Sequence, residues 1–191
     1  MNTNRLEAFS DGVLAIIITI MVLEFKVPKG ISFEVLKPLF PIFMTYMLSF
    51  IYLGIYWNNH HHLFHAINRV NGKILWANLN LLFWLSLLPW VTGWMGENYF
   101  EKNPTALYGV VLFLAALAFK ILVYLVVKNE GKESKLAKIY FKDKKLKISL
   151  FLYFAGIAAS FLLPLLAIAI YSLVGLMWII PDKRIEKSIS E

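Results

Sequence analysis

An acidic side chain lies at the start of the first long apolar stretch of the chain. Asp11 follows Ser10 and precedes the aliphatic run of residues 13–23. At a helix start, both side chains would accept hydrogen bonds from free backbone N–H groups. The surrounding span is also long enough to cross a bilayer, since ~20 apolar residues cover ~30 Å. A carboxylate at a membrane boundary is costly in free energy and usually has a function, so Asp11 is the first candidate functional residue.

The same segment has two different faces when it is projected as a helix at ~100° per residue. Ile16, Ile20 and Leu23 fall on one stripe, with Thr19 at its edge. Asp11 lies on the far side, ~140° away from Ile16. Periodicity alone favours packed core or lipid contact for the aliphatic stripe. The carboxylate on the other face needs a partner.

Four histidines follow the second apolar stretch, and they are the most obvious candidates for metal binding. Two of them, His61 and His65, are four residues apart, a spacing that can hold zinc on one helical face. The sequence offers no clear carboxylate or cysteine beside them to complete a site, so we expect hydrogen bonding at a polar helix end and no metal. The four residues are His60, His61, His62 and His65.

Two asparagines, Asn78 and Asn80, lie inside the third apolar stretch. Amides at membrane depth usually form hydrogen bonds between helices. Because two residues apart on a helix cannot face the same way, we expect one of them to meet the first helix, although packing against another neighbour is equally open. No Gly-rich phosphate loop, serine–base pair or carboxylate pair is present, so we expect no catalytic residue and no enzyme activity.

The composition places these residues in a membrane protein. The 191 residues are 59% hydrophobic and 16% charged, with a mean hydropathy of +0.65, which is more apolar surface than a soluble domain needs. Without cysteine there is neither disulfide nor thiolate chemistry. The polar start and the long apolar run argue against a cleavable signal peptide. The net charge of +7 is concentrated in loops and tail, so no nucleic-acid partner is expected.

Alternating apolar stretches and polar breaks predict an all-α fold, with residues 1–191 forming a single transmembrane domain embedded in the lipid bilayer. Pro89 is expected to kink the third helix and Pro164 to separate the last two. The basic loop 128–147 is expected to hold a short amphipathic helix. The six tryptophans and nine tyrosines are expected to be largely interfacial anchors. The six predicted transmembrane helices cover about residues 8–26, 39–62, 74–95, 105–127, 148–162 and 165–180.

The distribution of basic residues predicts the orientation. With six helices and both termini on one side, that side carries most of the 19 Lys and Arg residues, including those of the 128–147 loop. The positive-inside rule then makes both termini cytoplasmic. With five helices, the basic tail would lie outside. The expected location is a prokaryotic cell membrane.

The start of the first predicted helix resembles a known family. Arg5-x-x-x-Phe9-Ser10-Asp11 is similar to the R-x-x-x-F-S-D signature of the lysosomal-type potassium channels, the transmembrane protein 175 family and its bacterial homologues. The resemblance covers nearly the whole chain as one six-helix repeat. It implies a homotetramer around one central pore, which is lined by the first helix and conducts K⁺, with no cofactor.

Two further stretches extend the resemblance. Trp57-x-x-His60-His61-x-x-Phe64 is similar to the family's W-x-x-H-H-x-x-F, and residues 75–90 are similar to its third helix. The resemblance implies a structural network that braces the first helix. We expect Asp11 to belong to it, with Arg5, one of the two histidines or an asparagine as partner, rather than to bind ions. The expected members are Arg5, Phe9, Ser10, Asp11, Trp57, His60, His61, Asn78 and Asn80.

Selectivity must come from side chains of the first helix, because the chain contains no T-V-G-Y-G filter sequence. The expected pore and gate residues, Ile16, Thr19, Ile20 and Leu23, span ~10 Å of helix rise. Rings of isoleucine and leucine would form a narrow hydrophobic gate, and Thr19 supplies the only hydroxyl on this face. The expected function is a potassium channel, weakly to moderately selective over sodium.

Two other functions remain open at this point. A small ion- or proton-coupled transporter would use Asp11 and the histidine cluster as a relay. A structural or interaction protein would have no pathway. The sequence shows no internal repeat or pair of broken helices, which disfavours the transporter. Flux measurements in reconstituted membranes distinguish the three.

Overall fold

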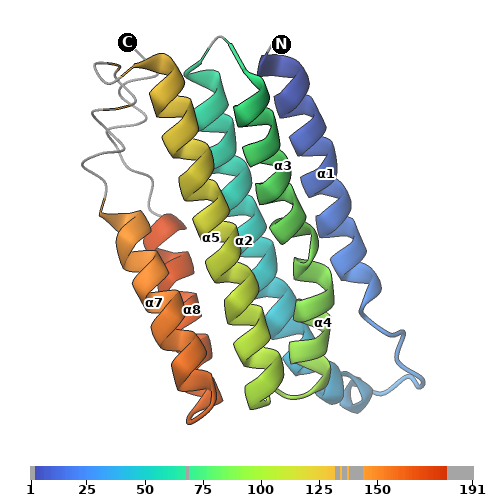
Figure 1. Cartoon of the computed structure of the whole chain (residues 1–191). Helices are drawn as coiled ribbons and strands as arrows, with labels where there is room; N and C mark the ends of the chain where they lie inside the picture. Colours follow the sequence, from blue (N-terminus) through green and yellow to red (C-terminus); the bar gives the residue numbers. More distant parts are fainter. Residues whose placement is uncertain (1–2, 68, 132–133, 135–136, 138–143, 180–191) are drawn as a thin grey trace.

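Apolar segments separated by Pro, Gly and polar residues fold into helices that run along one common axis (Figure 1). The computed structural model describes residues 3–67, 69–131, 134, 137 and 144–179, and this part of the chain contains no β-strand. The elements are α1 (Thr3–Leu23), the 3₁₀ helix η1 (Phe33–Leu39), α2 (Phe40–His65), α3 (Gly72–Ser86), α4 (Leu88–Glu97), α5 (Lys102–Glu130), α7 (Lys145–Ser160) and α8 (Pro164–Ile179).

Several of these helices have the length and apolar character of membrane spans. Within the part of the chain that the structure describes, four stretches qualify by length and composition: Thr3–Leu23, Phe33–His65, Gly72–Glu97 and Lys102–Glu130. The helices α7 and α8 have only 16 residues each, or ~24 Å, and lie side by side along the lower part of α5 (Figure 1). The protein is therefore a polytopic membrane protein of the all-α class.

The helices begin and end at other residues than the sequence predicts. The first helix begins at Thr3 rather than residue 8 and ends at Leu23 rather than residue 26. The fourth predicted helix, α5, extends by three residues at each end, to Lys102 and Glu130. The extensions arise because backbone hydrogen bonding continues into polar residues at helix ends, beyond the point where the chain stops being apolar.

The predicted third helix over residues 74–95 is two helices, because α3 ends at Ser86 and α4 begins at Leu88. Pro89 occupies the first turn of α4 and lacks the N–H that would bond to the preceding turn. The chain instead tightens at Leu87, whose N–H bonds to the Trp84 carbonyl at 3.3 Å. Leu87 keeps helical backbone angles and Gly72–Glu97 still qualifies as one span, so the interruption is the kink that was expected at Pro89.

The interior between α2, α5, α7 and α8 is rich in tyrosine, contrary to the expectation of interfacial anchors. Tyr52, Tyr108, Tyr153 and Tyr171 are all buried. The Tyr52 hydroxyl donates to the Tyr171 carbonyl at 2.5 Å, and the Tyr108 hydroxyl lies 3.0 Å from Ser49 Oγ. Tyrosine is stable here because a hydrogen-bond partner meets each of these hydroxyls within the bundle.

Two glycines make room for one of these rings. A Cβ on Gly109 would lie 2.0 Å from the Tyr171 hydroxyl oxygen, and one on Gly156 would lie 2.4 Å from Tyr171 Cε1. Tyr171 of α8 therefore fits between α5 and α7 only because both neighbours lack a side chain.

The predicted amphipathic helix in the 128–147 loop lies mostly outside the described residues, and the chain ends, 1–2 and 180–191, lie outside them too.

Candidate pore face and its supporting network

Helix α1 has one buried face and one bare face. The bare face carries the predicted stripe: Ile16 is 59% exposed, Ile20 43% and Leu23 78%. Thr19 lies on the same face and is exposed. Of the four long spans, α1 has the smallest buried share. The buried face, which packs on α2, α3 and α4, consists of Leu6, Ser10, Leu14, Ile17 and Met21.

Thr19 has a fixed hydroxyl orientation. Its Oγ1 donates to the Ile16 carbonyl at 2.9 Å, so the proton is engaged with the backbone and the oxygen lone pairs remain available. Lone pairs of this kind are what a dehydrating cation requires. Near the other end of the same face, a Cβ on Gly12 would meet nothing within 4 Å. The face is thus aliphatic and open, and it carries one hydroxyl oxygen.

A buried chain of hydrogen bonds joins α1, α2 and α3 behind this face. Ser10 Oγ donates to the Leu6 carbonyl at 2.9 Å and accepts from Asn78 Nδ2 at 2.9 Å. Asn78 Oδ1 therefore faces His60 Nε2, 2.7 Å away, and His60 must carry its proton on Nε2 to donate. All three polar side chains are fully buried, so the chain holds the three helices in one register.

Two further contacts join α1 to α2 beside this chain. Trp57 Nε1 donates to Asp11 Oδ1 at 3.0 Å, and His61 Nδ1 donates to Glu7 Oε1 at 2.5 Å. Asp11 is thus held by an indole, not by Arg5, a histidine or an asparagine. The two acidic residues are four apart on α1 and their partners four apart on α2, as antiparallel helices require.

Glu7 is the member of this network that sequence reasoning missed. The matching four-residue spacings of Glu7 and Asp11 on one helix and of Trp57 and His61 on the next are the signal that could have identified it. The predicted helix begins at residue 8, which leaves Glu7 outside it, whereas α1 begins at Thr3 and includes Glu7.

Three expected members lie outside the network. Arg5, Phe9 and Asn80 are exposed, and Phe9 lies on the bare side of α1 with 52% of its surface accessible. Among the described residues no salt bridge joins Arg5 to Asp11. Asn80 is two residues from Asn78 and therefore points away from α1, so Asn78 is the asparagine that meets the first helix.

The far end of α1 is held separately. Lys26 Nζ lies 2.6 Å from Glu97 Oε1 at the end of α4, and this carboxylate raises the pKa of Lys26 above its ordinary value. The Phe25 ring packs edge-on against Tyr46 of α2, with centroids 5.3 Å apart. The pore candidate is therefore fixed at both ends while its bare face remains uncovered.

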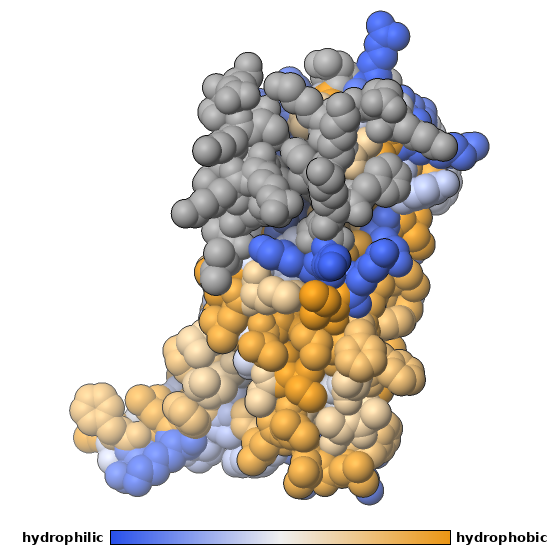
Figure 2. Space-filling view, turned by 90° about the vertical axis from the view of Figure 1, so that its left-hand side faces the viewer, coloured by the Kyte–Doolittle hydropathy of each residue, from blue (hydrophilic) through white to orange (hydrophobic). Residues whose placement is uncertain are grey.

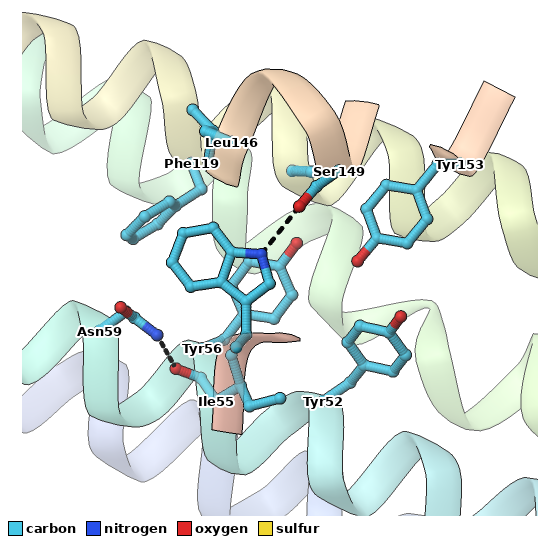
Figure 3. A pocket seen from close by; sticks show the side chains of 10 residues that line it. Tyr52, Ile55, Tyr56, Asn59, Phe119, Leu146, Ser149 and Tyr153 are labelled. Atoms are coloured by element: carbon cyan, nitrogen blue, oxygen red, sulfur yellow. Dashed lines mark hydrogen bonds between the residues drawn. The ribbon is translucent and has the colours of Figure 1, made fainter. Parts of the chain in front are cut away.

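A histidine cluster and a small cavity lie away from this face. In the part of the chain that the structure describes, no three His, Cys, Asp or Glu side chains gather as metal ligands do. A cavity of about 30 Å³ lies between α2, α5, α7 and α8, walled by Tyr56, Phe119 and Tyr153 (Figure 3). The Trp178 side chain lines another side of the cavity, and its Nε1 donates a hydrogen bond to Ser149 Oγ at 2.8 Å. This volume holds about one water molecule.

Comparison with known proteins places this geometry in context. The sequence model described as "Endosomal/lysosomal potassium channel TMEM175" matches residues 5–89. A protein named as a potassium channel from Chryseobacterium sp. (strain P1-3) is 57% identical over 191 residues, which cover 100% of both chains. Another from Streptomyces collinus is 38% identical over 128 residues, 63% of this chain and 62% of that protein.

A solved structure shares the fold. The crystal structure of a lysosomal potassium-selective channel TMEM175 homolog from Chamaesiphon minutus superposes with a TM-score of 0.77 at 24% identity. The superposition covers 92% of this chain and 95% of that one.

Proposed function

This chain belongs to the family of the endosomal/lysosomal potassium channel TMEM175, and from that premise we propose that it is a potassium channel formed by four copies around a central pore. The name of the 57% identical relative supports potassium as the permeant ion. The observation that carries the pore assignment is the bare aliphatic face of α1 on a helix whose opposite face and both ends are fixed. We place the channel in a prokaryotic cell membrane with both termini cytoplasmic.

The proposed gate is the aliphatic part of this face. Four copies of Ile16 would surround a sub-nanometre neck lined by aliphatic side chains, with Thr19 and then Ile20 and Leu23 beyond it. Such a neck sheds water, and an ion entering it would lose hydration without compensation. Conduction therefore requires the neck to widen, and α1 must move relative to its copies.

The proposed selectivity element is Thr19. Its oxygen is the only side-chain oxygen on the stripe, and its proton is already bonded to the Ile16 carbonyl. Four such oxygens replace only part of the water shell of an ion. The selectivity that follows is for K⁺ over Na⁺ at a weak to moderate level, because K⁺ is less strongly hydrated.

The supporting network has a structural function in this proposal. The Ser10–Asn78–His60 chain and the Asp11–Trp57 contact resist rotation of α1 about its axis. A rotation of one residue, ~100°, would turn the bare face into the bundle. The network therefore determines which side chains face the pore, and its members do not bind ions.

The test is a pair of matched substitutions in reconstituted protein. Ile16→Asn should keep the neck wet and give larger currents with a reversal potential nearer zero under K⁺/Na⁺ bi-ionic conditions. Ile121→Asn makes the same change on the exposed surface of α5, where Ile121 is 42% accessible, and should leave both quantities unchanged.

Two results would contradict the proposal. If Ile121→Asn changes permeation and Ile16→Asn does not, α1 does not line the pore. If ion movement in the unmodified protein is driven by a second ion gradient rather than passive, the protein is a coupled transporter.

A further inference from the structure

The segment between α1 and α2 carries large apolar side chains that the other described residues leave uncovered. We call residues 24–39 the α1–α2 arm. Val27 is 89% exposed, Ile31 107% and Phe33 88%. No residue of η1, the 3₁₀ helix within this arm, is buried. An uncovered run of large apolar side chains of this kind marks a surface that contacts something other than water.

The arm is nevertheless a folded element. Gly30 has a φ of +127°, which a glycine adopts without strain, and the Val35 side chain closes over it, 3.2 Å from where a Cβ would be. Ser32 Oγ accepts a hydrogen bond from the Glu34 N–H at 3.3 Å. The exposed apolar side chains therefore project from a folded backbone segment.

The 3₁₀ helix η1 within the arm has an apolar side and a charged side. With three residues per turn, side chains three apart are eclipsed. Phe33 and Leu36 therefore share one side, both exposed. Glu34 and Lys37 share another and form an ion pair.

The position of the arm matches its amphipathic character. It connects the end of α1 to the start of α2 and projects sideways from the lower end of the bundle (Figures 1 and 2). Figure 2 shows its hydrophobic atoms on the upper side, toward the level of the spanning helices, and hydrophilic atoms below. An element at a membrane boundary presents this orientation when its apolar side dips into the lipid.

We propose that the α1–α2 arm is a membrane anchor that lies in the interfacial region of the leaflet at this end of the bundle. Ile31, Phe33 and Leu36 enter the boundary between headgroups and acyl chains. Lys29, exposed on the same arm, approaches lipid phosphate. A second copy of the chain fits less well as the occupant, because lysine is depleted where protein surfaces pack together.

The anchor acts directly on the proposed pore helix. The arm begins where α1 ends, and the Lys26–Glu97 contact lies at the junction. Leaflet forces on the arm therefore reach the end of α1 that carries Leu23.

Single cysteines test the anchor without background labelling, because the natural chain has none. Nitroxides are attached to Ile31→Cys and Phe33→Cys in the full chain, reconstituted in vesicles of phosphatidylcholine and phosphatidylglycerol. Glu34→Cys, on the charged side of the same 3₁₀ helix, is the matched control. Collision with an aqueous nickel chelate should be several-fold less frequent at positions 31 and 33 than at 34, and collision with oxygen more frequent.

Two outcomes would overturn the proposal. Equal access of the nickel chelate to all three positions would place the arm in water. Spectral broadening at position 31 that disappears on dilution with unlabelled protein would place it against a second copy. The measurement requires no ion current, so it stands whether or not the channel proposal does.

Discussion

At the scale of single residues, the structure separates two kinds of polar group on one helix. Ser10 and Asp11 face the bundle and bond to Asn78 and Trp57, whereas Thr19 faces outward. Groups of the first kind contribute stability and register, since their alternative is an unsatisfied polar atom in an apolar interior. Thr19 exposes its hydroxyl oxygen on the bare face of the helix.

We predict that Thr19→Val lowers the preference for K⁺ over Na⁺, while the channel can still close. The substitution keeps the shape of the side chain and removes its oxygen, and it leaves the isoleucine neck intact. Thr19→Ser keeps the hydroxyl and should retain the selectivity of the unmodified protein. Bi-ionic reversal potentials of the three proteins measure the effect, and equal values for all three would remove Thr19 from the selectivity element.

We predict that Asn78→Ala destabilises the protein by about 1 kcal/mol, because it leaves the buried His60 Nε2–H without an acceptor. Asn80→Ala, an exposed position two residues away on the same helix, should have no effect. Thermal unfolding in detergent, followed by tryptophan fluorescence, measures both. An equal loss for the two variants would show that the hydrogen-bond chain contributes nothing specific.

At the scale of elements, α7 and α8 are held to the bundle by aromatic packing. Tyr171 of α8 fills the gap between Gly109 of α5 and Gly156 of α7, and its hydroxyl donates to the Thr105 carbonyl at 3.4 Å. Tyr171 therefore joins α8 to both α5 and α7. Glycine is required on both sides by the closeness of the ring.

We predict that Gly156→Ala loosens the α7–α8 pair and lowers the free energy of unfolding by about 1–3 kcal/mol, the usual cost of overpacking. Gly175→Ala on α8 is the control, since its Cβ would meet the Tyr52 ring only at an ordinary 3.8 Å. Hydrogen exchange of α8 amides should rise in the first variant alone. Unchanged exchange in Gly156→Ala would mean that Tyr171 moves aside freely.

At the scale of the whole molecule, the passes of the chain run alternately up and down (Figure 1). The α3 start and α5 end therefore lie at one end of the bundle, and the α4 end and the α1–α2 arm at the other. Because of this arrangement, the side of the membrane on which one loop lies determines the side of every other loop. The basic residues of the sequence favour the first end as cytoplasmic.

We predict that a membrane-impermeant thiol reagent labels Asn98→Cys, but not Asn71→Cys, in intact cells. Both side chains are exposed, at opposite ends of the bundle, so accessibility differs only through the membrane. Permeabilised cells should label both positions equally. Labelling of Asn71→Cys alone in intact cells would invert the proposed orientation.

Much of the fold was open to prediction because it depends on local chemistry. Apolar runs of sufficient length become membrane helices whatever surrounds them, since backbone groups in lipid must bond within the helix. The two-faced character of the first helix, with Ile16 and Asp11 on different sides, likewise follows from the angle per residue alone.

Other features depended on how the helices meet. In a membrane, lipid is as apolar as leucine, so hydropathy does not distinguish a side chain in the core from one facing outward. The partner of Asp11 is Trp57, and Glu7 joins the network, because the register of α1 against α2 places them opposite one another. Tyr171 is buried because two distant glycines face it. Such relations between residues far apart in the chain are determined by helix packing, which only the tertiary structure shows.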